Sequence, residues 1–113
     1  MKHTLKLQPK YYECVKNGTK IIELRLLDQK RKSIKIGDEV EFLREPELNE
    51  SIITKVKGLL LYSSFEDIIA DYPISYFSDG KTTKEELIEV LNSFYPKEKQ
   101  EELGVIGIRI ERI

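Results

Sequence analysis

The sequence contains few of the residues that metal, redox and membrane functions require. Its 113 residues include one cysteine, one histidine and no tryptophan. Because Cys14 is the single cysteine, an internal disulfide is excluded. Since His3 is also the single histidine, a zinc site built from cysteines and histidines is excluded as well. We therefore expect no metal and no cofactor. Apolar runs, such as the three leucines at 59–61, are far too short to cross a bilayer, so we expect no membrane partner.

Signals for export and signs of disorder are also missing. The N-terminus lacks the apolar core of a secretion signal, and a lone cysteine fits a reducing compartment, so we expect a soluble cytoplasmic protein. Hydrophobic residues make up 40% and charged residues 35%, which excludes collagen-like, low-complexity and wholly disordered chains. The length fits a single domain over residues 1–113 with one core.

The formal net charge of −1 hides a separation of charges along the chain. Residues 1–35 hold ten basic and three acidic residues, whereas residues 36–113 hold nine basic and seventeen acidic residues. Such an asymmetry can mark a surface for a polyanion such as RNA. Alternatively, the two parts fold together and their charges interleave. The sequence leaves both interpretations open, because position along a chain is a weak guide to position in space.

Alternating polar and apolar residues predict five strands, at 2–7, 20–27, 39–43, 51–62 and 105–110. Within the second strand, Ile22 and Leu24 lie on one face and Glu23 and Arg25 lie side by side on the other. Gly58 indicates a β-bulge in the long fourth strand.

Capping residues and breakers predict three helices. The first begins at Pro9 and ends at Asn17-Gly18. A capping box of Ser63 with Glu66 predicts a second helix over 65–70. Another, of Thr83 with Glu86, predicts a third helix that runs to about Tyr95. The buried stripe of this third helix is expected to contain Leu87, Leu91 and Phe94. Residues 97–103 add one helical turn, and 28–35 and 74–81 are expected to be loops. Five to six strands with three peripheral helices predict an α+β fold built on a small β-barrel, because closure removes exposed strand edges.

Four residues around the second strand form a motif, G-x-K-x-x-E-x-R, consisting of Gly18, Lys20, Glu23 and Arg25. The Gly37-Asp38 turn, Tyr95-Pro96 and the final strand follow in the same order as in the ASCH (activating signal cointegrator homology) family, which this chain resembles over nearly its whole length. The resemblance implies a PUA-like β-barrel with a cleft proposed to bind RNA. Some members of the family are enzymes, including amidohydrolases that act on acetylated cytidine and reported ribonucleases.

The motif residues are the first candidates for a binding site. Lys20 can contact a phosphate, or act as a base if it is partly desolvated. Since Lys20 does not fit the apolar register of the strand, we expect its truncation to cost the fold little. Glu23 and Arg25 can form an ion pair, which either orders the wall of the cleft or holds the arginine for a ligand.

Aromatic and basic residues nearby extend the candidate site. Of Tyr11 and Tyr12, one is expected to pack inward, and the other, assigned as Tyr11, to stack on a base. A basic loop suited to phosphates contains Lys30, Arg31, Lys32 and Lys35. The alternative for these residues is a solvated surface.

The resemblance does not extend to the amidohydrolase nucleophile. In those relatives a threonine stands three residues after the motif lysine, where this chain has Glu23, and the position of their acidic partner falls near Gly80, next to Asp79. A carboxylate does not replace a hydroxyl as nucleophile in amide cleavage. The leading hypothesis is an RNA- or nucleotide-binding domain with a cleft floored by Lys20, Glu23 and Arg25 and the basic loop at its rim. The alternatives are a small hydrolase, with Lys20 and Glu23 as weak catalytic candidates, and a protein-interaction module.

Overall fold

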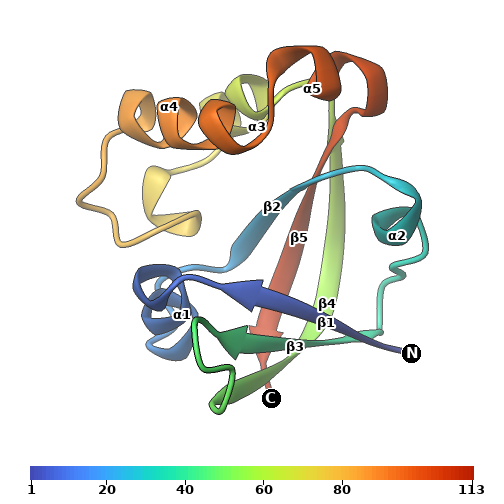
Figure 1. Cartoon of the computed structure of the whole chain (residues 1–113), viewed down its shortest axis with the longest axis vertical. Coiled ribbons are helices and arrows are strands. Elements are labelled where there is room, and N and C mark those ends of the chain that lie inside the picture. Colours follow the sequence, from blue (N-terminus) through green and yellow to red (C-terminus); the bar gives the residue numbers. More distant parts are fainter.

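A computed structural model describes all residues from 1 to 113. Its centre is a five-stranded sheet that curls into a half-barrel (Figure 1). The strands are β1 (Lys2–Leu7), β2 (Ile22–Leu26), β3 (Glu39–Arg44), β4 (Ser51–Tyr62) and β5 (Val105–Arg112), in the order β1-β3-β4-β5-β2. The β1–β3 pair is parallel and the other three pairs are antiparallel. The α+β class with a small, strongly curved sheet is therefore confirmed, with β1 and β2 as its edge strands.

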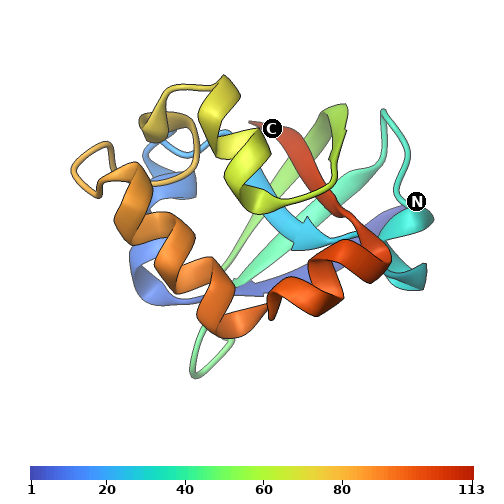
Figure 2. The same cartoon turned by 90° about the horizontal axis from the view of Figure 1, so that it is seen from above.

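Five helices cover this sheet rather than three. They are α1 (Pro9–Lys16), α2 (Gln29–Lys32), α3 (Phe65–Asp71), α4 (Lys84–Phe94) and α5 (Lys97–Leu103), with a 3-10 turn at Ile74–Tyr76. Figure 2 shows α3, α4 and α5 together over one part of the sheet, with α1 and α2 at opposite sides of the molecule. None of the helices has the length and apolarity needed to cross a membrane.

Local hydrogen bonds explain where the helices begin. The Asp28 side chain accepts from the Arg31 N–H and starts a four-residue helix, α2, in the segment expected to be a loop. At α3 the N-cap is Ser64, which accepts from the Asp67 N–H, so the predicted capping box of Ser63 and Glu66 is wrong. The capping box of Thr83 and Glu86 at α4 is confirmed.

Two hydrophobic clusters hold the layers together. One fills the hollow of the sheet against α1 and includes Phe42 and Tyr12, and the other packs β2 against α3 and α4 through Ile22, Phe65 and Leu91. The predicted bulge in β4 is confirmed by a register shift between Val56 and Gly58. The stripe expected on α4 is only partly correct, because Leu87 and Leu91 are buried whereas Phe94 is 59% exposed.

The start of β1 is held by Asp38, which follows the turn before β3. His3 Nε2 lies 2.8 Å from Asp38 Oδ2, the N-terminal amine 3.2 Å from Oδ1, and the Lys35 N–H donates at 3.0 Å. A carboxylate only accepts hydrogen bonds, so His3 Nε2 carries the proton in this contact. The hydrogen bonds from His3 and Lys35 lower the pKa of Asp38 to about 2.

We expect this carboxylate to make the stability of the fold depend on pH. An aspartate in an unfolded chain has a pKa of about 3.9. The stabilisation is therefore fully present above about pH 4 and is lost as the pH falls toward 2, the folded pKa of Asp38. Asp38→Asn should melt below wild type at pH 6, and the gap should close as the pH approaches 2 in thermal melts. A gap that stayed constant between pH 6 and pH 2 would contradict this role.

Candidate functional site

A cavity of about 270 Å³ opens between α4 and the edge formed by α1, β1 and β2. Fifteen residues line it, and nine of them are hydrophobic. The polar residues of its floor include Lys20, Glu23 and Arg25, so the structure brings the three motif residues together in one place. We name this cavity the Lys20 pocket.

Lys20 lies at the bottom of this pocket and is 5% exposed. Its ammonium group donates to the Ile22 carbonyl at 3.0 Å and to the Phe77 carbonyl at 2.9 Å, and contacts Glu23 Oε1 at 3.0 Å. These three acceptors satisfy its three N–H donors. Lys20 is thus buried rather than at the surface and joins β2 to the segment before α4, so we now expect its truncation to weaken the fold.

Glu23 connects the two cations of the motif. Its Oε2 accepts from Arg25 Nε at 2.8 Å, and Arg25 Nη2 also lies 2.8 Å from the same oxygen. Arg25 Nη2 donates further to the Lys6 carbonyl on β1 at 2.8 Å, which joins the two edge strands. The predicted pair of Glu23 and Arg25 on one strand face is confirmed. Arg25 Nη1 makes no hydrogen bond within the chain, so its two N–H groups are free for a ligand.

The charges of this triad reinforce each other. Burial alone would raise the pKa of Glu23, but the cations Lys20 and Arg25 outweigh it and lower that pKa below its usual range. For Arg25, burial alone would lower the pKa, but the negative charge of Glu23 outweighs burial and raises the pKa above its usual value. Glu23 is thus held as a carboxylate between two cations, which makes it a poor proton acceptor for a general base.

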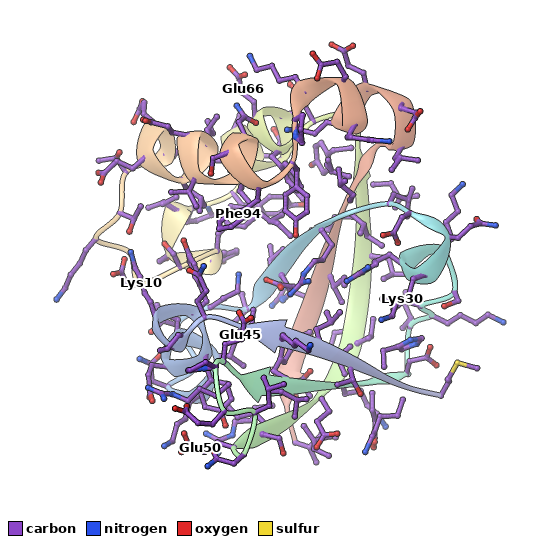
Figure 3. The ribbon with its side chains drawn as sticks, in the orientation of Figure 1. Lys10, Lys30, Glu45, Glu50, Glu66 and Phe94 are labelled. Carbon is purple, nitrogen blue, oxygen red and sulfur yellow. The ribbon has the colours of Figure 1, made fainter.

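Aromatic rings form the sides of the pocket. Tyr11 lines it, with its ring centroid 5.6 Å from Lys20 Nζ, whereas Tyr12 is buried in the core. Burial, and secondarily the charge of Glu23, raise the pKa of Tyr11, so its hydroxyl stays protonated. On the opposite wall, Phe94 of α4 exposes its ring to the cavity mouth. Figure 3 shows Phe94 on one side of this gap and Glu45, another lining residue, on the other.

The basic loop does not contribute to the rim of the Lys20 pocket. None of its four basic residues lines the cavity, and Arg31 is engaged by Asp28 at 3.1 Å. Figure 3 shows Lys30 on the side of the molecule opposite Lys10, which precedes the lining residue Tyr11. The prediction of a rim made by Lys30, Arg31, Lys32 and Lys35 is thus corrected. Any contact of these residues with RNA would have to be made elsewhere on the surface.

Half of the basic residues near the N-terminus form ion pairs. Five of the ten basic residues in the first 35 pair with acidic partners, in the bridges Lys2–Glu41, Lys10–Asp79, Lys20–Glu23, Arg25–Glu23 and Arg31–Asp28. Two of these bridges, Lys2–Glu41 and Lys10–Asp79, join the two parts of the sequence, and Figure 3 shows Lys10 and Lys30 on opposite sides of the molecule, so residues 1–35 do not form one cationic face.

Several features of the pocket were not found from the sequence. The Phe77 carbonyl, Phe94 and Glu45 all belong to the site, but nothing in their local sequence marks them. Asp79 does not line the pocket, and its carboxylate accepts from the N–H groups of Lys81 and Thr82 instead. Cys14 is buried, and burial raises the pKa of its thiol. No group of three histidine, cysteine or carboxylate side chains is arranged to hold a metal ion.

Comparisons with known proteins agree with the overall fold. The sequence model of the ASCH domain matches residues 5–113. The crystal structure of the hypothetical protein PH0355 is similar with a TM-score of 0.88 and 38% identity, over 100% of both chains. The solution NMR structure of protein PF0455 from Pyrococcus furiosus is similar with a TM-score of 0.79 and 34% identity, over 100% of this chain and 98% of that one. No curated protein matches the chain.

Proposed function

The chain belongs to the ASCH domain family, and on this basis we propose that it binds RNA or a nucleotide, with one base in the Lys20 pocket. The observation that carries the proposal is the pairing of a buried, charged floor with exposed aromatic walls in one cavity. A volume of about 270 Å³ is slightly below the range of about 300–1,000 Å³ that is typical of small-ligand sites. That size suits one base or nucleoside better than a larger group.

The polar groups of the pocket match the edge of a base. Arg25 Nη1 offers two N–H donors, which suit ring nitrogen and carbonyl acceptors. Glu45 lines the same cavity and forms no ion pair, so its carboxylate can accept from an exocyclic amine. Tyr11 and Phe94 offer ring faces on which a base can stack. In this proposal Lys20 and Glu23 position Arg25, and Lys20 does not contact a phosphate directly.

We expect Phe94→Ala to weaken binding of single-stranded RNA without weakening the fold. Stacking of a base on an aromatic ring contributes about 1–3 kcal/mol, so the Kd should rise about 5- to 150-fold. Phe94 is 59% exposed, so the melting temperature should stay close to wild type. Fluorescence anisotropy with a labelled mixed-sequence RNA measures the affinity.

The matched control for Phe94 is Ile36→Ala. Ile36 is a similarly exposed apolar residue that does not line the pocket. Its truncation should leave the Kd unchanged. Equal affinities for wild type and Phe94→Ala would exclude the α4 wall from the binding site.

Amide hydrolysis of acetylated cytidine is not supported by the site. Glu23 stands where the related enzymes have their threonine, and both of its oxygens are engaged by Lys20 and Arg25. We expect purified protein to release no cytidine from N4-acetylcytidine, because no serine, threonine or cysteine lines the cavity. Chromatographic detection of free cytidine checks this, with a preparation from cells lacking the chain as background. Turnover above that background, lost in Glu23→Gln, would revive the hydrolase alternative.

The proposed function also bears on the domain organisation and the cellular location of the protein. A single domain over residues 1–113 acting on RNA or nucleotides would find its ligand in the cytoplasm, which fits a buried thiol that forms no disulfide. A protein-interaction module has less support, because the charged floor of the pocket is buried below its opening.

A further inference from the structure

A second cavity lies where the end of α1 meets the β4–β5 pair. Its volume is about 610 Å³, and only three of its ten lining residues are hydrophobic. Lys57 of β4, Arg109 and Arg112 of β5 and Gly18 after α1 all line it. Lys20 also lines it, and is the residue that the two cavities share. This second cavity is called the β-bulge groove.

The β-bulge groove is strongly cationic in a protein whose formal net charge is −1. Four of its lining residues are basic and one, Glu111, is acidic. Lys57, Arg109 and Arg112 take part in none of the ten ion pairs of the chain. Three basic side chains without an ion pair, gathered around one concave surface with a single acidic neighbour, indicate an anionic ligand.

The bulge of β4 produces this arrangement. The register shift between Val56 and Gly58 inserts Lys57 as an extra residue in the strand. Gly58 lies opposite Arg109, and a Cβ at Gly58 would stand 3.4 Å from Arg109 Cβ. The missing side chain gives Arg109 room beside Lys57. On the other side of the groove, Arg112 is anchored by a hydrogen bond from Nη1 to the Lys16 carbonyl.

From these observations we propose that the β-bulge groove binds the phosphodiester backbone of the RNA strand whose base occupies the Lys20 pocket. The inference rests on the proposed function. The planar guanidinium group of arginine presents donors that match phosphate oxygens, and the flexible lysine adds a point charge. Lys20 lines both cavities, which places the groove beside the pocket. In this proposal the nucleotides next to the bound base run along the groove. The groove then supplies affinity that does not depend on sequence, and the pocket reads one base.

The test compares two variants with the same change in net charge. Lys57→Glu/Arg109→Glu reverses two exposed charges in the β-bulge groove, and Lys30→Glu/Lys32→Glu reverses two exposed charges on α2, outside both cavities. Thermal melts first establish that both are folded. For single-stranded RNA at moderate salt, the groove variant should lose about tenfold or more in affinity, whereas the α2 variant should lose much less. The slope of log K against log salt should fall by about 0.7 for each lost contact.

Two further ligands separate this inference from the proposed function. A nucleoside carries no phosphate, so both variants should bind it as wild type does. Inorganic tripolyphosphate carries only phosphate, so wild type should bind it and the groove variant should not. If wild type binds neither RNA nor nucleoside, the proposed function fails. If it binds both, but the groove variant keeps the wild-type RNA affinity and salt slope, the groove inference fails and the proposed function stands. Equal competition by polyglutamate of matched charge would also overturn the phosphate assignment.

Discussion

Replacing Lys20 by methionine should destabilise the fold by about 3–5 kcal/mol, the loss typical of breaking a buried ion pair by removing one partner. The substitution keeps most of the aliphatic stem but removes the ammonium group. Glu23 Oε1 then loses its partner at 3.0 Å, and the carbonyls of Ile22 and Phe77 lose their donor. Urea denaturation at pH 7, with circular dichroism as the probe, measures the free energy of unfolding.

A control and a double variant make the Lys20 result specific. Lys10→Met removes an ammonium group from an exposed position on α1, and should change the free energy of unfolding by no more than about 0.5 kcal/mol. Lys20→Met/Glu23→Gln removes both buried charges, so its loss should be smaller than the sum of the two single losses. A Lys20→Met variant as stable as Lys10→Met would show that the contacts of Lys20 contribute little.

Gly107→Ala should cost about 2–3 kcal/mol, near the upper end of the range for overpacking a core. Gly107 lies in β5, opposite Leu24 on β2 and Leu60 on β4. A Cβ at this position would stand 2.5 Å from Ile68 Cδ1 and 3.1 Å from Ile22 Cγ2, so these two fully buried side chains would have to repack. The free energy of unfolding in urea measures the cost.

Two further variants, a control and a rescue, test the contact that Gly107→Ala would create. Gly58→Ala also adds a Cβ within a paired strand, but its nearest contact is 3.4 Å, so it should cost clearly less. Ile68→Val removes the Cδ1 methyl that the new Cβ would meet. The double variant Gly107→Ala/Ile68→Val should therefore be more stable than the sum of the two single losses predicts. Strict additivity would contradict the proposed contact.

Local chemistry was enough to predict much of the architecture. Alternation located the five strands, Gly58 located the bulge, and Thr83 with Glu86 located the start of α4. Each of these signals depends on residues within a few positions of each other. Where two neighbouring residues offer the same chemistry, local reasoning failed. Ser64 rather than Ser63 caps α3, because it is the Ser64 side chain that accepts from the helix N–H of Asp67.

The site was predicted less completely, because its geometry depends on contacts that are distant in sequence. The pairing of Glu23 with Arg25 follows from the two-residue repeat of a strand and was predicted. The burial of Lys20 depends on the Phe77 carbonyl, 57 residues away, which no local pattern indicates. The helical repeat of α4 placed Phe94 in the core, but α4 extends past the core at that point and its ring borders the pocket.

The central claim, that the Lys20 pocket receives a base of RNA, can be tested directly by nuclear magnetic resonance. Wild-type protein labelled with ¹⁵N is titrated at low salt with a short single-stranded RNA of mixed sequence. The proposal predicts that the amide resonances of Tyr11, Glu23, Arg25 and Phe94 shift together and saturate with one affinity, because these four residues line one cavity. Spectra in which these four resonances stay in place at saturating RNA would contradict it, whatever shifts elsewhere.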